Sequence, residues 1–177
     1  FIHARSLGKK FSVILTETRP LYQGRITAVE LIKAGLNNVT MIIDDYASTM
    51  LLENKMNINA VFIGADLLSQ HGFVNKVGSR GIASASAINQ IPVYNLSILL
   101  KYDPRPYSDE FIEKRDDLEI WPEAPKELKF LTPAFDYIPY GKNTLIVTEA
   151  GILTGNEVKT SSYELYSFLK SDLLAAS

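Results

Sequence analysis

Cysteine is absent from the 177-residue chain, which excludes a disulfide framework, a thiolate metal site and a thiol nucleophile within these residues. Histidine is scarce as well. His3 and His71 are too few for a histidine-rich metal centre or a serine–histidine triad, and we interpret both as solvated loop residues. No apolar run approaches the roughly 18 residues of a membrane-spanning helix, and no signal peptide is recognisable. These absences predict a soluble cytoplasmic protein with no bound metal and no membrane contact.

An excess of basic residues is lacking too, because 18 Lys and Arg face 20 Asp and Glu and the formal net charge is −2. Direct binding of nucleic acid is therefore not expected. Neither a Walker A sequence nor a G-x-G-x-x-G fingerprint occurs, so we predict no nucleotide cofactor. The 46% hydrophobic content suits one domain over residues 1–177. Because the chain opens with Phe1 and not with methionine, we expect a fragment or a processed form.

The order of the predicted elements indicates an α/β fold. Strands are predicted from short apolar runs at residues 11–15, 39–43, 61–63, 92–96 and 145–147. Helices are predicted from apolar spacing and capping residues over 25–34 and 79–89, and from a capping box at Ser161 and Glu164. In the first helix Ile26, Val29 and Ile32 form the apolar stripe, and Gly35 suits the position that ends it. This alternation predicts a parallel sheet with helices on both faces and functional groups at its carboxyl edge.

The alternation stops at residues 101–140, which contain six of the eight prolines. A long irregular segment inside a compact domain is usually a functional or interface loop. It carries large aromatic side chains, which are Trp121, Phe130, Phe135, Tyr137 and Tyr140. Either the domain itself or a second subunit must cover them, and a self-packed loop is the alternative to an interface.

Residues 61–79 (VFIGADLLSQHGFVNKVGS) contain the best candidate for a ligand site. Asp66 stands just beyond the carboxyl end of a predicted strand, where α/β sheets bind ligands. Asn75 and Lys76 come shortly before Ser79, which we predict to be the N-cap of a helix. A helix start with free N–H groups and a lysine nearby suits an anion, so the set predicts a phosphorylated-sugar site. The alternative is that Asp66 and Asn75 only stabilise turns and Lys76 is solvated.

Several motifs in this chain resemble one protein family over essentially its whole length. The motifs are TETRPLYQG at 16–24, GAD at 64–66, NKVGS at 75–79, IPVY at 91–94 and TEAGIL at 148–153. Their order is similar to that in the alpha, beta and delta subunits of translation initiation factor two-B. It is also found in methylthioribose-1-phosphate isomerase and archaeal ribose-1,5-bisphosphate isomerase. The resemblance implies a single Rossmann-like carboxyl-terminal domain over 1–177, without the family's helical amino-terminal domain.

The resemblance also implies roles for individual residues. Arg19 and Gly24 would contact a sugar phosphate, Asn75 and Lys76 would hold its oxygens, and Asp66 would be the acid/base residue of an isomerase. Two departures bear on the function. The isomerases pair this aspartate with a cysteine upstream of the E-x-R-P segment, and the chain has none. Residues 97–102 (SILLKY) also lack the Glu-Thr that many relatives carry before the lysine.

Three functions remain open on these grounds. As a regulatory relative of the translation factor, the domain would bind initiation-factor subunits and sense a sugar or nucleotide phosphate. As part of an isomerase, it would use Asp66 with an upstream cysteine. As an assembly module, it would bind no small molecule. The first is our leading prediction, and a two-fold homodimer is expected in each case.

Overall fold

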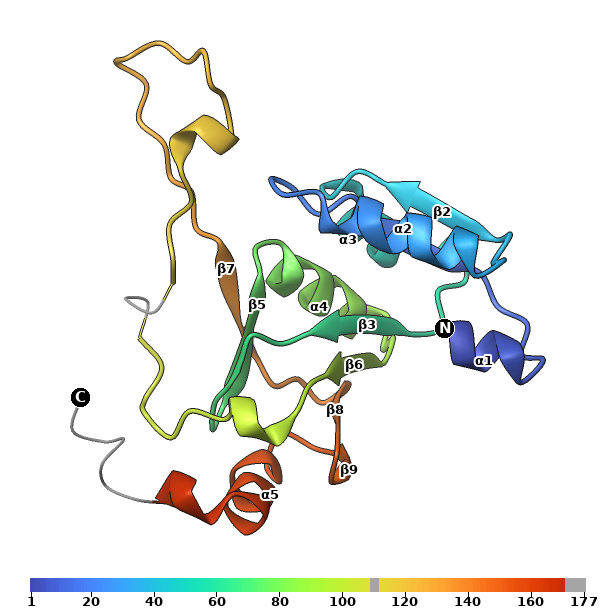
Figure 1. The fold of residues 1–177 in the computed structure, drawn as a ribbon, viewed down its shortest axis with the longest axis vertical. Coiled ribbons are helices and arrows are strands. Elements are labelled where there is room, and N and C mark those ends of the chain that lie inside the picture. The colour runs from blue at the N-terminus through green and yellow to red at the C-terminus, as the bar shows by residue number, and fades with distance from the viewer. Residues whose placement is uncertain (109–111, 171–177) are drawn as a thin grey trace.

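The computed structural model describes residues 1–108 and 112–170. Its helices are α1 (Ile2–Ser6), α2 (Gln23–Lys33), α3 (Tyr46–Glu53), α4 (Ser79–Ile88) and α5 (Val158–Leu165). Its strands are β1 (Val13–Thr16), β2 (Val39–Ile42), β3 (Val61–Gly64), β4 (Leu67–Leu68), β5 (Gly72–Lys76), β6 (Val93–Leu96), β7 (Phe135–Pro139), β8 (Thr144–Thr148) and β9 (Gly151–Leu153). Helices separate the parallel strands β1, β2, β3 and β6, as the sequence predicts, although β4 and β5 intervene between β3 and α4. The chain has an α/β fold (Figure 1).

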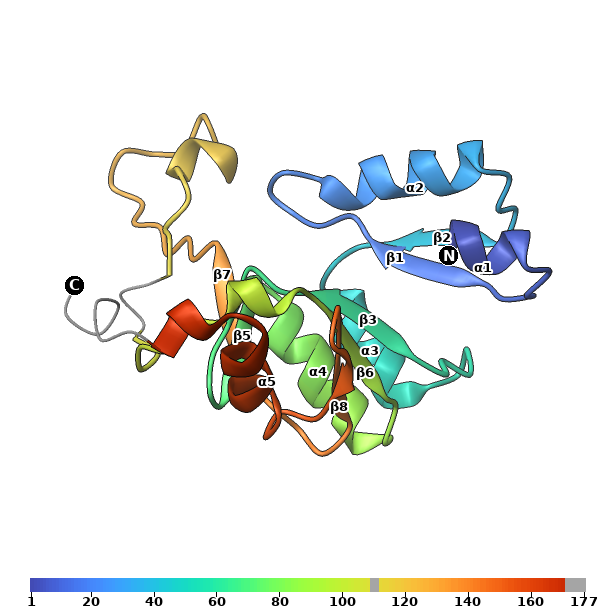
Figure 2. The ribbon, with the colours of Figure 1, turned by 60° about the horizontal axis from the view of Figure 1, so that its bottom comes forward.

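The first unit of the fold is the parallel pair β1–β2 with α2 beside it (Figure 2). Val13, Leu31 and Leu36 form its small core. Gly35 follows the helix with φ +81°, a left-handed conformation that glycine adopts at little cost, so the predicted helix end is confirmed. The apolar stripe predicted for α2 is not buried against the sheet. Its members Ile26, Val29 and Ile32 are each half or more exposed. The helix packs on β1 and β2 through its buried residues Gly24 and Leu31.

The second unit is a four-stranded sheet in the order β3-β6-β8-β9. The first three strands run parallel, and β9 returns antiparallel at the edge. Ile63, Val93 and Ile146 belong to its buried core. Ile82 of α4 packs against this core, and Val158 of α5 is part of it, so both helices cover apolar residues of the sheet. Among the described residues this is the largest buried cluster. It supports the strand ends that carry the candidate site residues.

A third sheet, in the order β4-β5-β7, is antiparallel and was not predicted from the sequence. Its strand β5 carries Asn75 and Lys76, for which no strand was predicted. Asn75 pairs in register with Asp136, and Lys76 with Phe135. The pairing partner lies about sixty positions away in the chain, so no local pattern in residues 72–76 could reveal it.

The prediction of one continuous parallel sheet is therefore wrong. β1 and β3 make no ladder hydrogen bonds, and the structure has separate parallel and mixed sheets. Aromatic side chains link the two parallel units instead. The ring of Phe1 lies 5.8 Å from that of Phe11 and 5.3 Å from that of Phe62, and Phe62 stacks on Tyr94 at 5.4 Å between centroids. The contact between the units is thus made by side chains and not by backbone pairing.

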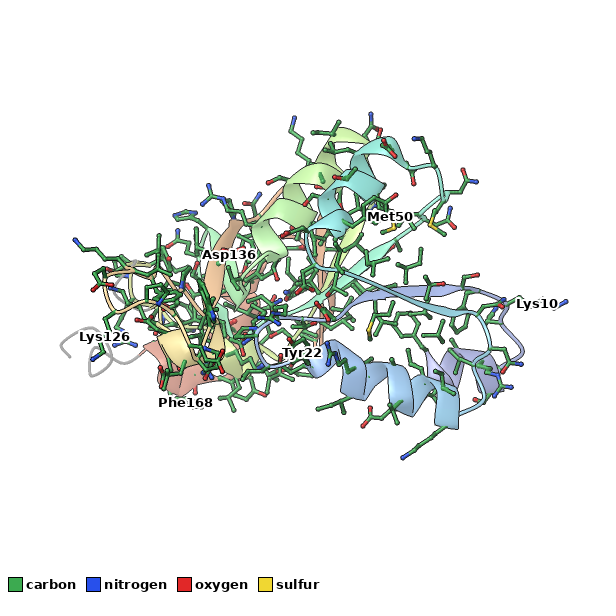
Figure 3. All side chains as sticks on the ribbon, turned by 90° about the horizontal axis from the view of Figure 1, so that it is seen from above. Lys10, Tyr22, Met50, Lys126, Asp136 and Phe168 are labelled. Atoms are coloured by element: carbon green, nitrogen blue, oxygen red, sulfur yellow. The ribbon has the colours of Figure 1, made fainter. Side chains whose placement is uncertain are left out.

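Residues 112–134 form an arm that projects from the body of the molecule (Figure 1). Figure 3 shows Lys126 of the arm and Lys10 at opposite ends. In its described part the arm contains the short 3-10 helix η3 (Asp117–Glu119) and a bridge between Lys114 and Pro133. The predicted irregular segment 101–140 is wrong at its end, because 135–139 form β7.

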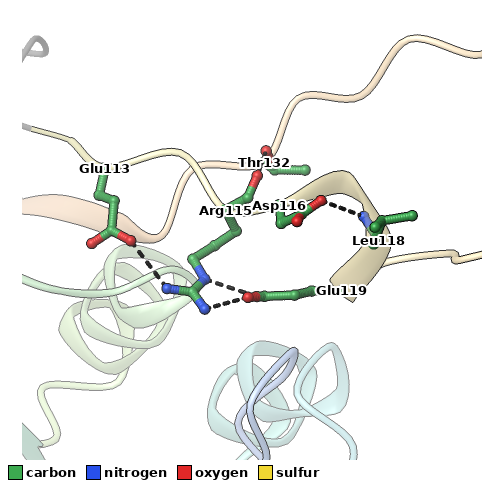
Figure 4. A network of polar contacts seen from close by, with 6 residues as sticks. All are labelled: Glu113, Arg115, Asp116, Leu118, Glu119 and Thr132. Carbon is green, nitrogen blue, oxygen red and sulfur yellow. Dashed lines mark hydrogen bonds and ion pairs between the residues drawn. The ribbon is translucent and has the colours of Figure 1, made fainter.

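A polar network stiffens the arm (Figure 4). The guanidinium of Arg115 pairs with the carboxylates of Glu119 and Glu113, the second at 3.0 Å. Thr132 donates its hydroxyl to the Arg115 carbonyl at 2.7 Å, which joins the two sides of the arm. Asp116 accepts from the Leu118 N–H and begins η3. These contacts join the two sides of the arm beside η3, although the arm carries little regular structure.

The last helix begins earlier than the capping box predicts. α5 starts at Val158, so Ser161 lies inside the helix and not at its N-cap. The Glu157 carboxylate accepts hydrogen bonds from both the backbone N–H and the hydroxyl of Thr154, each at 2.7 Å. These bonds lower the pKa of Glu157 below its usual range. In the described ranges no helix is long and apolar enough to cross a membrane, and no group of three acidic, histidine or cysteine side chains is suited to hold a metal ion.

Candidate functional site

A crevice of about 390 Å³ lies between the loop after β1 and the start of α4. On one side it is lined by residues that follow β1 and β2, and on the other by the turn before α4; these are Glu17, Arg19, Ile43, Asp44, Asp45, Val77 and Gly78. The first group lies at the carboxyl ends of two parallel strands, where α/β folds bind ligands. Of the predicted site residues Arg19 lines this crevice, and Lys76 is the chain neighbour of its lining residue Val77.

Asp44 holds the loop of the E-x-R-P motif in place. Its carboxylate accepts hydrogen bonds from the backbone N–H groups of Thr18 at 2.8 Å and Arg19 at 2.7 Å. Asp44 and Asp45 directly precede α3, but neither side chain makes a cap bond there. Asp44 instead ties the end of β2 to the loop after β1, which fixes the backbone of Arg19.

Gly24 is needed for close packing of α2 on β1. A Cβ at this position would lie 1.8 Å from the carbonyl oxygen of Thr16, so no other residue fits without moving the helix. The start of α2 therefore sits directly against the carboxyl end of β1. The structure gives Gly24 this packing role in the motif, and its contact with a ligand remains a prediction.

Two arginines contact the side chain of Tyr22 at the start of α2. The guanidinium of Arg25 lies 3.6 Å from the centre of the Tyr22 ring and that of Arg19 lies 5.0 Å from it, close enough for cation–π attraction. Arg19 also donates to the Tyr22 hydroxyl. Arg25 is paired with Glu17 at 2.9 Å, whereas Arg19 has no carboxylate partner among residues 1–108 and 112–170. Arg19 is thus the side chain on this wall that is able to attract an anion.

Asp66 follows β3 by two residues, as predicted, and its side chain is exposed. Its backbone N–H donates to the Val74 carbonyl at 2.8 Å, which ties the end of β3 to β5. The ammonium of Lys101 donates to the Ala65 carbonyl at 2.5 Å, so a positive charge lies beside the residue that precedes Asp66. Sequence reasoning did not assign a role to Lys101, although its segment was noted as a departure from the family pattern.

Asn75 is held by its neighbours on β3 and α4. Its amide group lies 2.7 Å from the Ser79 hydroxyl. In the orientation that satisfies both amide atoms, the nitrogen donates to the Gly64 carbonyl at 3.1 Å and the oxygen accepts from Ser79. Asn75 is half-buried and Ser79 is 7% exposed. The structure therefore brings Asn75, Ser79 and the end of β3 together.

The start of α4 differs from the prediction in two respects. Its N-cap is Gly78, with φ +96°, and Ser79 is the first helical residue. The carboxylate of Asp136, on β7, accepts from the N–H groups of Gly78 at 2.8 Å and Arg80 at 3.0 Å. Two of the N–H groups expected to be free for an anion are therefore occupied. No local signal near residue 79 indicates this, because Asp136 is far away in the chain.

Lys76 completes the set of predicted residues. Its ammonium lies 5.1 Å from the centre of the Phe135 ring, and no carboxylate pairs with it in the described part of the chain. Arg19 lines the crevice, whereas Gly24 packs behind it and Asp66, Asn75 and Lys76 gather around the ends of β3 and β5. The convergence of all five on one ligand remains a prediction.

A model of the initiation factor 2 subunit family matches residues 1–155. The chain belongs to this family, whose members include sugar-phosphate isomerases and translation-factor subunits. It is 38% identical over 161 residues to the methylthioribose-1-phosphate isomerase of Syntrophotalea carbinolica, which is 86% of this chain and 46% of that protein. It is 34% identical over 155 residues to the ribose 1,5-bisphosphate isomerase of Archaeoglobus fulgidus, which is 85% of this chain and 48% of that protein.

Two crystal structures resemble the fold closely. The 5-methylthioribose 1-phosphate isomerase from Pyrococcus horikoshii gives a TM-score of 0.79 at 26% identity, covering 92% of this chain and 48% of its own. The delta subunit of translation initiation factor eIF-2B from A. fulgidus gives a TM-score of 0.76 at 30% identity. The match covers 95% of this chain and 49% of that subunit. The chain spans about half the length of the relatives it matches. The expected resemblance is confirmed.

Proposed function

We propose that this chain is the carboxyl-terminal half of a sugar-phosphate aldose–ketose isomerase of the methylthioribose-1-phosphate or ribose-1,5-bisphosphate type. The observation that supports this most directly is the position and exposure of the Asp66 carboxylate. Its carboxylate follows the carboxyl end of β3, is exposed, and has no hydrogen-bond partner among the described residues. Such a group is able to exchange a proton with a bound sugar. The names of relatives with 34–39% identity favour an isomerase over our leading sequence-based prediction, a translation regulator.

In this proposal the other residues bind the substrate. Arg19 and Lys76, which lack carboxylate partners in the described ranges, attract the phosphate. Asn75 holds sugar oxygens near the end of β3, and Gly24 lets the loop after β1 approach the ligand. Moving a proton between adjacent carbons requires two positioned groups, and the family resemblance assigns the second to a cysteine upstream of the E-x-R-P motif. We therefore predict that the 177-residue chain alone binds substrate but does not convert it.

The test is a calorimetric titration of the chain with ribose-1,5-bisphosphate and methylthioribose-1-phosphate. Lys76→Ala should weaken binding by about 1.5–3 kcal/mol, roughly ten- to a hundredfold, because it removes a hydrogen bond to a charged group. Lys142→Ala, which changes an exposed lysine in the turn before β8, is the matched control and should leave binding unchanged. Wild-type protein that binds neither sugar phosphate would contradict the proposal. Conversion of either compound by the chain alone, followed by NMR, would refute the two-group argument.

A translation-regulating role is the second candidate. It is favoured by the 30% identity to the eIF-2B delta subunit. The same residues would then sense a sugar or nucleotide phosphate, and initiation-factor subunits would be the partners. Nucleoside monophosphates in the same titration separate the candidates, because a sensor for nucleotides should bind them at least as tightly as the pentose phosphates.

We also propose that two copies of the chain associate through the arm. Its tip carries exposed apolar side chains, which are Leu118, Ile120, Trp121, Leu128 and Leu131. Exposed apolar side chains gathered in one segment often mark an interface. The Arg115 ion pairs order the part of the arm next to these side chains, which lowers the entropic cost of binding a partner.

A further inference from the structure

Asn95 is a fully buried polar residue in the middle of the main sheet. It lies on β6 in register between Ile63 of β3 and Ile146 of β8, in a row that is otherwise apolar. Its exposure is 0%, and its side-chain oxygen has no hydrogen-bond partner among the residues that the structure describes. An unpaired buried acceptor costs about 1–3 kcal/mol, whereas an aliphatic residue of similar size would cost nothing of this kind. A polar side chain at this position therefore needs a compensating role.

The amide nitrogen of Asn95 shows what that role is. It donates to the carbonyl oxygen of Gly64 at 2.8 Å. In the orientation of the Asn75 amide that satisfies both of its polar atoms, the same carbonyl accepts from the Asn75 nitrogen at 3.1 Å, and the Asn75 oxygen accepts from the Ser79 hydroxyl at 2.7 Å. Asn95, Gly64, Asn75 and Ser79 thus form a continuous hydrogen-bonded chain, which we call the amide relay. The relay connects β6, β3, β5 and α4 through one buried path.

The relay joins the backbone segments that carry the proposed site. Gly64 is two residues before Asp66, and Asn75 directly precedes Lys76. The Asp66 N–H donates to Val74 at 2.8 Å, so β3 and β5 are also tied beyond the relay. Because the end of a strand is free to fray, two amide donors on the Gly64 carbonyl hold it against both the sheet and β5. The link therefore fixes the backbone that carries Asp66 relative to the backbone that carries Lys76.

We propose that Asn95 is a positioning residue, which acts through the Gly64 carbonyl and Asn75 to hold Asp66 and Lys76 in the geometry that the sugar phosphate requires. The identity of the ligand in this inference rests on the proposed function, whereas the amide relay does not depend on it. Asn95 does not contact the ligand, because it is completely buried beneath the end of β3. The arrangement depends on the residue at position 95 having a donor, so a leucine of similar size breaks the relay without leaving a hole.

The relay is tested first without ligand, by NMR of the 177-residue chain. Asn95→Leu should shift the side-chain amide resonances of Asn75 and speed the exchange of the Asp66 amide at least about tenfold. Asn143→Leu is the matched control, because Asn143 donates to the Ile91 carbonyl at 2.7 Å at the other end of the strands. It should change neither signal. Unchanged Asn75 resonances and Asp66 exchange in Asn95→Leu would overturn the proposal.

A second variant covers the case in which Asn95→Leu does not fold. Ser79→Ala removes only a hydroxyl at the far end of the relay, and it should shift the side-chain amide resonances of both Asn75 and Asn95. A shift confined to Asn75 would show that no relay exists.

Titration with ribose-1,5-bisphosphate then tests the role in binding. Asn95→Leu should bind about tenfold more weakly than the wild type, and Asn143→Leu should bind equally well. Equal affinity of Asn95→Leu and the wild type would overturn the positioning role. If the wild type does not bind, the proposed function fails, and the NMR results alone decide whether the relay exists.

Discussion

Replacing Gly24 with alanine tests how tightly α2 packs on β1 and whether that packing sets the loop of the E-x-R-P motif. The added Cβ would lie 1.8 Å from the Thr16 carbonyl oxygen and 2.9 Å from its carbon. Both are backbone atoms, so no side-chain rotation can relieve the overlap. The start of α2 must therefore move by about 1 Å or more to restore an ordinary contact.

The expected magnitude is a net loss of about 2 kcal/mol in the free energy of unfolding. Overpacking of this kind costs about 1–3 kcal/mol or more, and the better helix propensity of alanine returns about 0.5–1 kcal/mol. For a chain of this size such a loss lowers the melting temperature by about 4–8 °C. The effect should concentrate in the β1–α2–β2 unit, whose core consists of Val13, Leu31 and Leu36 with a few half-buried neighbours.

The assay combines urea unfolding with hydrogen exchange of the Thr18 and Arg19 amides. Both amides donate to Asp44, and they should exchange faster in Gly24→Ala because the loop moves with the helix. Gly81→Ala in α4 is the control. Its Cβ would lie 3.1 Å from the Ser48 hydroxyl, a side chain that can rotate away, so stability should stay within about 1 kcal/mol. A Gly24→Ala protein as stable as the control, with unchanged exchange at Thr18 and Arg19, would refute the reasoning.

Two further predictions concern the core and the arm. Burial raises the pKa of Tyr102 to about 12, with a smaller contribution from Tyr163. An unfolded tyrosine ionises near pH 10, so the free energy of unfolding should fall as pH rises from about 10 to 12. In urea unfolding over that range, the Tyr102→Phe protein should lose about 1–2 kcal/mol less of this free energy than the wild type. Tyr140, whose pKa burial also raises, should leave part of the decline in place. Leu131 is 85% exposed on the arm, and Leu131→Lys should shift the chain from dimer towards the 19.7 kDa monomer in sedimentation at micromolar concentration. Ile88→Lys, which changes an exposed residue at the end of α4, is the control and should not shift the chain towards the monomer. A wild-type chain that is monomeric would contradict the proposed association.

Much of the local structure was predictable because short-range chemistry determines it. The parallel strands are runs of apolar residues, and each was found within a few positions of its place in the structure. Gly35 ends α2 because a left-handed residue was needed there. The order of the motifs was sufficient to identify the family, and Asp66 follows β3 where a parallel strand was expected to end.

The tertiary structure decided which groups meet across long separations in the chain. Asp136 binds the start of α4 from 56 and 58 positions away, where Ser79 was the predicted cap. Asp44 binds the loop after β1 from 26 positions away. β5 exists as a strand because β7 pairs with it, and β5 supports Asn75 and Lys76. Asn95 gave no signal in the sequence, since its role depends on a carbonyl of another strand. Hydrogen bonds between distant segments depend on the closed fold, and a pattern within one segment contains no information about them.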